Sequence, residues 1–280
     1  MVRWLASLGC VAMMMVTLDA ADPLPQAEAA YKKRDYATAR KLANEALALE
    51  PKNPEALYLL GLSCLRLRDN PAAEKAFTQL IELQPKLWYA YDGRGDALLK
   101  QGHFDAAVRD FDKALELNPQ FAPEHWRRGI ALYYAKKYAE GAKQFETHKL
   151  ANPQDVENAA WHYLCNAKVV GREKARRELI DVTQDRRVPM AEIQKLFAGH
   201  LTPADVVAAA EKIPENSQAG QEARFYAHLY IALWYDAEDK PEEARKHLAR
   251  AVKNHKIGHY MWDIGKVHLL TMEQKSDPQK

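Results

Sequence analysis

The chain has 280 residues, of which 48% are hydrophobic and 28% are charged, so it can bury a core under a well-solvated surface. Its 40 basic and 38 acidic residues leave a net charge of +2, which gives no reason to expect nucleic acid or an anionic membrane as a partner. Alanine, leucine, glutamate and lysine are abundant, and no segment alternates like a strand. We therefore expect an all-α fold.

The first 20 residues differ from the rest of the chain. Arg3 precedes an uncharged apolar run over residues 4–18, and Ala20 offers a small residue for cleavage. Because this run is shorter than the roughly 20 residues of a membrane-spanning helix, we predict that 1–20 is a cleaved signal peptide. Cys10 lacks the leucine three residues earlier that lipid attachment requires. We expect an unlipidated, periplasmic or secreted mature protein without a membrane span.

Four series of residues recur with a spacing of 34. They are Pro51, Pro85, Pro119 and Pro153; Gly61, Gly95 and Gly129; Ala39, Ala73, Ala107 and Gly141; and Phe77, Phe111 and Phe145. In a helix–turn–helix unit the small residues allow two helices to cross closely, and the phenylalanine fills the space between them. The proline ends the second helix, because it has no N–H to donate.

These series resemble the tetratricopeptide repeat (TPR), a helix–turn–helix unit of 34 residues. The resemblance implies an α-solenoid, in which antiparallel helix pairs form a right-handed superhelix. We place the array over 21–183. It comprises full repeats at about 54–87, 88–121 and 122–155, a partial repeat at 21–53 and a degenerate repeat at 156–183, where the expected helices are 156–168 and 172–183.

The register is lost after residue 183, where prolines stand at 189, 203 and 214. We predict an irregular helical insert over 184–220 with short helices near 189–198 and 203–212. Residues 221–272 are expected to form a C-terminal repeat-like pair, at 221–235 and 241–254, and a closing helix at 259–272. A polar tail follows at 273–280.

This order of elements is similar to that of the exported NlpI-type TPR proteins of bacteria. The resemblance implies an adaptor that brings a periplasmic protease to enzymes of cell-wall synthesis and hydrolysis. It therefore predicts a scaffold in cell-envelope protein quality control or cell-wall enzyme regulation.

The sequence offers little that suggests chemistry, and we expect no enzyme activity, cofactor or metal. His255 and His259 have the spacing of two metal ligands on a helix. However, Gly258 indicates a turn between them, and no glutamate follows His255 as in zinc proteases. Cys64 and Cys165 are expected to be buried small hydrophobes.

The resemblance also implies where a partner binds, because the first helix of each TPR pair lines a concave groove. The predicted groove residues are Tyr58, Leu62, Arg66, Tyr89, Asp92, Asp96, Trp126, Arg127, Ile130, Tyr133, Tyr134 and Trp161. Aromatic residues with arginine are typical of binding hot spots. We expect Trp126, Tyr133 and Tyr134 beside Arg127 to be the strongest set. We also expect Trp126 and Arg127 to point away from the inter-repeat core, so that removing either side chain should leave the fold intact. Alternatively, some of these residues pack against the neighbouring repeat.

The expected partner is a protein or a peptide, and the sequence leaves a homo-oligomer open. Chaperone-binding TPR domains hold a C-terminal carboxylate with a set of lysine, asparagine and arginine residues, and this sequence matches that set only at Arg127. An alternative function is an accessory subunit that binds envelope glycan, with Trp126 and Trp161 as stacking platforms.

Overall fold

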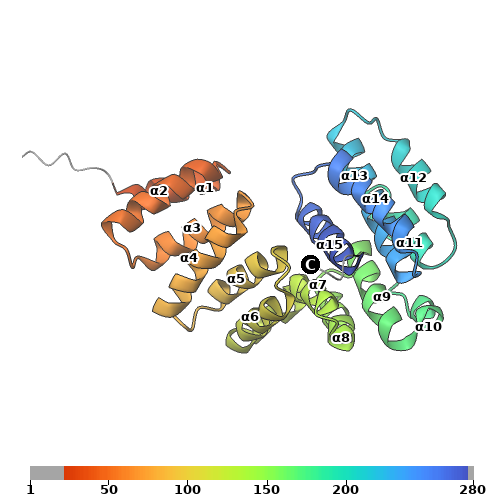
Figure 1. Ribbon diagram of the computed structural model, residues 1–280, viewed down its shortest axis with the longest axis horizontal. Helices are drawn as coiled ribbons and strands as arrows, with labels where there is room; N and C mark the ends of the chain where they lie inside the picture. The colour runs from red at the N-terminus through yellow and green to blue at the C-terminus, as the bar shows by residue number, and fades with distance from the viewer. Residues whose placement is uncertain (1–21, 277–280) are drawn as a thin grey trace, which may run out of the picture.

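The computed structural model describes residues 22–276, which contain helices and no strand (Figure 1). The first half consists of four antiparallel pairs, with a 3-10 helix before the fourth. They are α1 (Pro23–Lys32) with α2 (Tyr36–Leu49), α3 (Pro54–Arg66) with α4 (Asn70–Leu83), α5 (Trp88–Lys100) with α6 (Phe104–Leu117), and, after η1 (Pro119–Glu124), α7 (Trp126–Tyr134) with α8 (Tyr138–His148). The predicted signal peptide and the end of the tail lie outside the described residues.

The second half begins with a long buried helix and ends with the closing helix. Its elements are α9 (Val156–Val170), α10 (Arg172–Arg177), α11 (Met190–Phe197), α12 (Pro203–Glu211), α13 (Gln218–Ala237), α14 (Pro241–Asn254) and α15 (Tyr260–Ser276). The two short helices of the insert and the late pair lie where the sequence predicts them. Helix α10 is shorter than the predicted 172–183, and residues 178–189 continue without a helix.

The first repeat, predicted only as a partial one, is a complete helix pair. Its two marker positions are occupied by Ala27, one period before Gly61, and by Ala43, one period before Phe77. Both alanines are fully buried. Two small residues thus meet where the other repeats have a glycine and an aromatic ring, so the packing is kept while the sequence signal disappears.

In the other repeats the glycine and phenylalanine series contact each other. An ideal Cβ would lie 2.7 Å from the ring of Phe77 at Gly61, 2.7 Å from Phe111 at Gly95, and 2.6 Å from Phe145 at Gly129. Real Cβ atoms essentially never come within 3.0 Å of another heavy atom. The ring of the second helix therefore lies directly on the backbone of the first, which explains why both series share one period.

The turn within each pair repeats a backbone conformation rather than a residue type. Arg34, Arg68, Gly102 and Lys136 all have positive φ, at 63°, 62°, 83° and 60°. In the first turn the N–H of Asp35 donates to the carbonyl of Ala30 at 2.9 Å, and the later turns repeat this bond. This bond to the carbonyl five residues earlier is typical of a helix ending in a left-handed residue. The four turns thus share one geometry although only one contains glycine.

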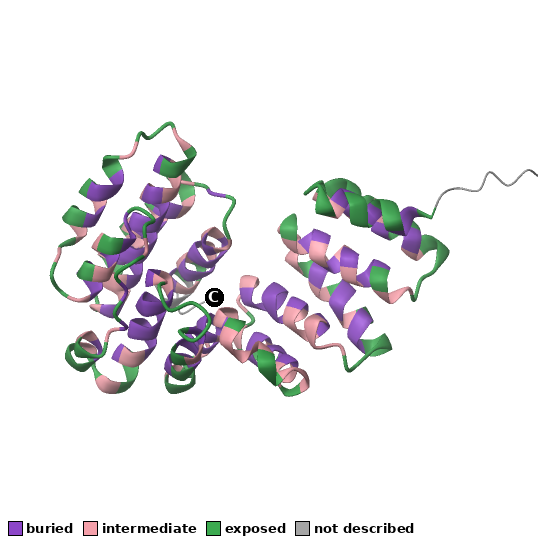
Figure 2. Ribbon diagram, turned by 180° about the vertical axis from the view of Figure 1, so that it is seen from behind, coloured by how far each residue is buried: buried purple, intermediate pink, exposed green. Residues whose placement is uncertain are grey.

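The pairs follow a curve, and α15 lies on its inner side (Figure 1). Figure 2 shows buried residues where neighbouring helices face each other and exposed residues on the outside and in the turns. One core cluster extends from Leu98 to Met272 and joins the array to the C-terminal helices. Helix α9 is buried around most of its circumference, including Trp161 and Tyr163. Among residues 22–276, no helix has both the length and the apolar character needed to cross a membrane.

The contact between Gly95 and Phe111 can be tested by Gly95→Ala. Alanine normally stabilises a helix interior relative to glycine by about 1 kcal/mol. Here its Cβ would overlap the buried ring, so we expect the substitution to lower the free energy of unfolding by about 1–3 kcal/mol in urea denaturation. The control is Gly258→Ala, where a Cβ has no neighbour within 4 Å. An equal effect of both substitutions would contradict this packing.

Candidate functional site

The concave side of the array is divided in two by α15. Tyr260, at its start, donates its hydroxyl to Asp96 of α5 at 2.6 Å, and its ring lies edge-on to Trp126 of α7 at 4.8 Å. Further along α15, the hydroxyl of Tyr134 lies 3.1 Å from Nδ1 of His268. The closing helix therefore covers the groove surface of α5 and α7.

A second contact fixes α15 to the turn between α3 and α4. The Nε of Arg68 donates to Asp263 at 2.8 Å, and the guanidinium lies 4.8 Å from the ring centre of Trp262. Buried residues of α15 include Met261, Asp263, Ile264, Gly265 and Val267. Because these buried residues are spread around the helix and not along one face, α15 packs on more than one side.

The predicted groove residues of the N-terminal repeats line a surface that is still open. Tyr58 and Tyr89 are half-buried, with ring centres 4.8 Å apart. Leu62 is half-buried and Arg66 is exposed, and both line a cavity described below. The structure therefore brings these four residues together on the concave side.

The predicted groove residues of α7 and α9 lie mostly inside the protein. Ile130, Tyr133 and Trp161 are 1%, 6% and 2% exposed, and the rings of Tyr133 and Trp161 lie 5.5 Å apart. The expectation that Tyr133 points into an open groove is therefore wrong. Trp126 and Tyr134 remain half-buried beneath α15. The buried indole of Trp161 also removes one of the two stacking platforms of the glycan-binding alternative.

Arg127, predicted to point freely into the groove, is part of a charge network beneath it. Its guanidinium donates to Asp92 at 2.5 Å. Burial raises the pKa of Asp92 despite this cation. Burial also acts against the neighbouring Asp96, but Lys100 and Arg127 hold the pKa of Asp96 below its usual value. The expectation that Arg127 could be removed without consequence for the fold is therefore corrected, because buried paired charges are costly to separate.

An open cavity of about 440 Å³ lies between the N-terminal repeats and the start of α15. Its lining residues include Tyr31, Arg34, Tyr36, Leu62, Leu65, Arg66, Arg68, Asp96, Lys100, Arg127, Tyr260 and Asp263. Arg68 and Lys100 pair with carboxylates of this lining. Arg34 and Arg66 have no carboxylate within ion-pair distance in the described part of the chain. The cavity therefore carries an excess of positive charge.

The described residues contain no group of histidine, cysteine and acidic side chains placed to hold a metal ion. Cys64 and Cys165 are both free and buried, as predicted. Burial raises the pKa of the Cys64 thiol to about 11 and that of Cys165 further. Neither thiol is thereby suited to act as a nucleophile.

Comparisons with known proteins agree with the repeat register. Residues 24–87, 88–121 and 226–256 each match a family model described as tetratricopeptide repeat. A tetratricopeptide repeat protein from Parabacteroides merdae is similar in structure, with 17% identity, a TM-score of 0.56, and coverage of 90% of this chain and 97% of that one. MamA from Desulfovibrio magneticus shares 18% identity over 55% of this chain and 88% of its own, with a TM-score of 0.51. At such identities the likeness concerns the fold alone. A search of curated proteins gave no match.

The docking of α15 can be tested by Tyr260→Phe. The substitution keeps the ring but removes the hydrogen bond to the buried carboxylate of Asp96, so we expect the free energy of unfolding to fall by about 1–3 kcal/mol. Urea denaturation provides the measurement. In the matched control, Tyr31→Phe, the lost contact is a 3.5 Å bond from the exposed Arg66, and we expect a change within about 0.5 kcal/mol. Equal stability of Tyr260→Phe and wild type would mean that α15 does not rest on α5 in solution.

Proposed function

The protein is a tetratricopeptide repeat protein, and we propose that it is a non-catalytic adaptor that binds an acidic segment of a partner protein in the open half of its groove. The repeats make it a protein-interaction scaffold. Such arrays use an extended concave surface for binding. The proposal specifies which part of this surface is used and the charge of the segment that it receives.

The observation that carries the proposal is the excess of positive charge in the cavity between α1, α3, α5 and the start of α15. Arg34 and Arg66 lie there without carboxylate partners among residues 22–276, beside the half-buried rings of Tyr31 and Tyr36. Arginine with tyrosine is the composition that protein interfaces favour. An acidic segment would pair with the two guanidinium groups while its apolar residues contact the rings and Leu62.

We further propose that this adaptor works outside the cytoplasm, in envelope protein quality control or in the regulation of cell-wall enzymes. The support comes from the apolar N-terminal run and from the order of repeats, insert and late pair, which is similar to that of NlpI-type proteins.

Binding in the open half is tested with short fluorescent peptides of acidic, neutral and basic composition. We expect the acidic peptide to bind, and Arg66→Ala to weaken its binding by about tenfold, because a charge-assisted hydrogen bond is lost. The matched control is Arg109→Ala, which removes an exposed arginine from α6. If all three peptides bind alike, or if both variants bind like wild type, the open half does not select an acidic segment.

Export is tested separately on protein isolated from the native source. We expect the mature chain to begin at residue 21, because the short apolar run is followed by a small residue at the cleavage position. Intact mass and N-terminal sequencing provide the measurement. A mass equal to that of all 280 residues, or a lipid adduct on Cys10, would contradict this expectation.

A further inference from the structure

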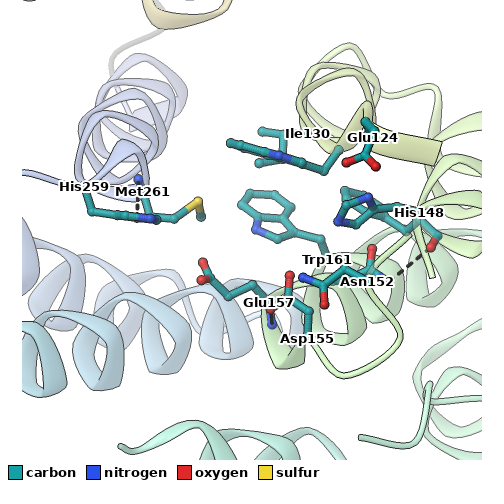
Figure 3. A pocket seen from close by; sticks show the side chains of 12 residues that line it. Glu124, Ile130, His148, Asn152, Asp155, Glu157, Trp161, His259 and Met261 are labelled. Carbon is teal, nitrogen blue, oxygen red and sulfur yellow. Dashed lines mark hydrogen bonds between the residues drawn. The ribbon is translucent and has the colours of Figure 1, made fainter. Parts of the chain in front are cut away.

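A second cavity, of about 300 Å³, lies between α7, α8, α9 and the start of α15 (Figure 3). Its volume is at the lower end of the range of ligand pockets, roughly 300–1,000 Å³. His259 borders this cavity and also the open cavity of the groove. In Figure 3 the indole of Trp161 lies at its centre, between Ile130 on one side and Glu157 with Asp155 on the other. The remaining apolar lining comes from Trp126, Phe145 and Met261.

Two buried polar atoms of this lining have no hydrogen-bond partner within the described residues. They are the indole Nε1 of Trp161 and the side-chain oxygen of Asn158, whose residues are 2% and 4% exposed. The amide nitrogen of Asn158 donates to the carbonyl of Phe145 at 3.1 Å, which leaves its oxygen as the free end. An unsatisfied buried polar group costs about 1–3 kcal/mol. The cavity lining therefore holds one donor without an acceptor and one acceptor without a donor.

The charged groups around the cavity are mostly acidic. Asp155 and Glu157 line it and share the guanidinium of Arg187 with Asp185, at distances of 2.8, 2.5 and 2.6 Å. Glu124, also in the lining, is exposed and has no ion-pair partner in the described part of the chain. Three carboxylates therefore share one cation, and a fourth, that of Glu124, has no cation within ion-pair distance in the described part of the chain.

The excess of carboxylates over cations around the cavity is accompanied by a shifted pKa of Glu157. Burial raises the pKa of Glu157 to about 7, although Arg187 acts against the shift. The carboxylate also accepts the hydroxyl of Tyr230 at 2.8 Å. A second cation beside Glu157 would stabilise its ionised form, so binding of a cation near neutral pH would release a proton.

We propose that this cavity binds the cationic side chain of an arginine or lysine from a partner protein. The half-buried ring of Trp126 would attract the cation, while Asn158 and the carboxylates accept its N–H groups. The indole N–H of Trp161 would donate to a main-chain carbonyl of the same segment. That the cation belongs to a protein rests on the proposed function, whereas the selection of a cation rests on the cavity alone.

The test is calorimetric titration with a blocked alanine peptide that carries one central arginine, compared with the same peptide carrying citrulline. Citrulline has nearly the same shape without the charge. We expect the affinity of the citrulline peptide to be lower than that of the arginine peptide by about tenfold or more, because citrulline forms no charge-assisted hydrogen bonds. Proton release on binding at pH 7 is a second expected readout. Equal affinity of the two peptides would overturn the proposal.

Variants locate the site. Glu124→Gln, at an exposed position, is expected to weaken binding of the arginine peptide several-fold, and Glu157→Gln is expected to abolish the proton release. The matched control is Glu82→Gln, at an exposed position of α4, with circular dichroism as a check of folding. Wild-type binding and proton release in both cavity variants would overturn the site.

Two further measurements separate this proposal from the proposed function. Arg66→Ala should weaken binding of the acidic peptide and leave binding of the arginine peptide unchanged, so either proposal can fail alone. N-acetylarginine amide distinguishes the sources of the cation. Weaker binding than that of the peptide supports a partner segment, whereas equal binding overturns the protein origin of the ligand.

Discussion

The contact between a glycine of the first helix and a phenylalanine of the second sets the geometry of the array. The ring of Phe77 lies against Gly61 of its own repeat and also against Gly93 of the next, where an ideal Cβ would be 2.5 Å from it. One ring thus fixes the distance between α3 and α4 and the distance from both to α5. Because the interior is close-packed, the distances between these three helices cannot change without overlap or a void. The side-by-side placement of α3, α5 and α7, on which the concave surface depends, follows from this contact.

The closing helix then determines how much of that surface a partner can reach. Burying a carboxylate such as Asp96 is costly unless it is paired and hydrogen-bonded. Lys100 of the same helix and Tyr260 of α15 meet this requirement together. The groove floor and α15 are therefore mutually dependent, since the helix satisfies a charge that the floor would otherwise expose. This leaves the N-terminal half of the concave side open and makes Trp126 and Tyr134 part of an intramolecular interface.

The sequence predicts the repeats well and the closed groove poorly, for physical reasons. A glycine under an aromatic ring is a local steric requirement, so it recurs in the sequence wherever the packing recurs. The first repeat is predicted only in part, because Ala27 and Ala43 allow the same close packing of the two helices without either marker residue. The contacts of α15 with Asp96 and Arg68 join residues separated by 164 and 195 positions. Tyrosine, aspartate and arginine are equally common on open surfaces, so no local pattern shows that they meet. The burial of Trp161 follows from the same long-range packing.

The concave side has positive charge at one cavity and negative charge at the other. Under the floor Arg127 and Lys100 are neutralised by Asp92 and Asp96, so the field on the open side comes from Arg34 and Arg66. On the other side of His259, several carboxylates share Arg187, so the charge around the second cavity is negative. A segment that spans both cavities would need acidic residues at one end and a basic residue at the other. The reverse orientation would place like charges together, and such repulsion is how interfaces reject a wrong register. Specificity for the direction of a bound chain would thus arise from the pairing of charges within the protein as much as from contacts with the partner.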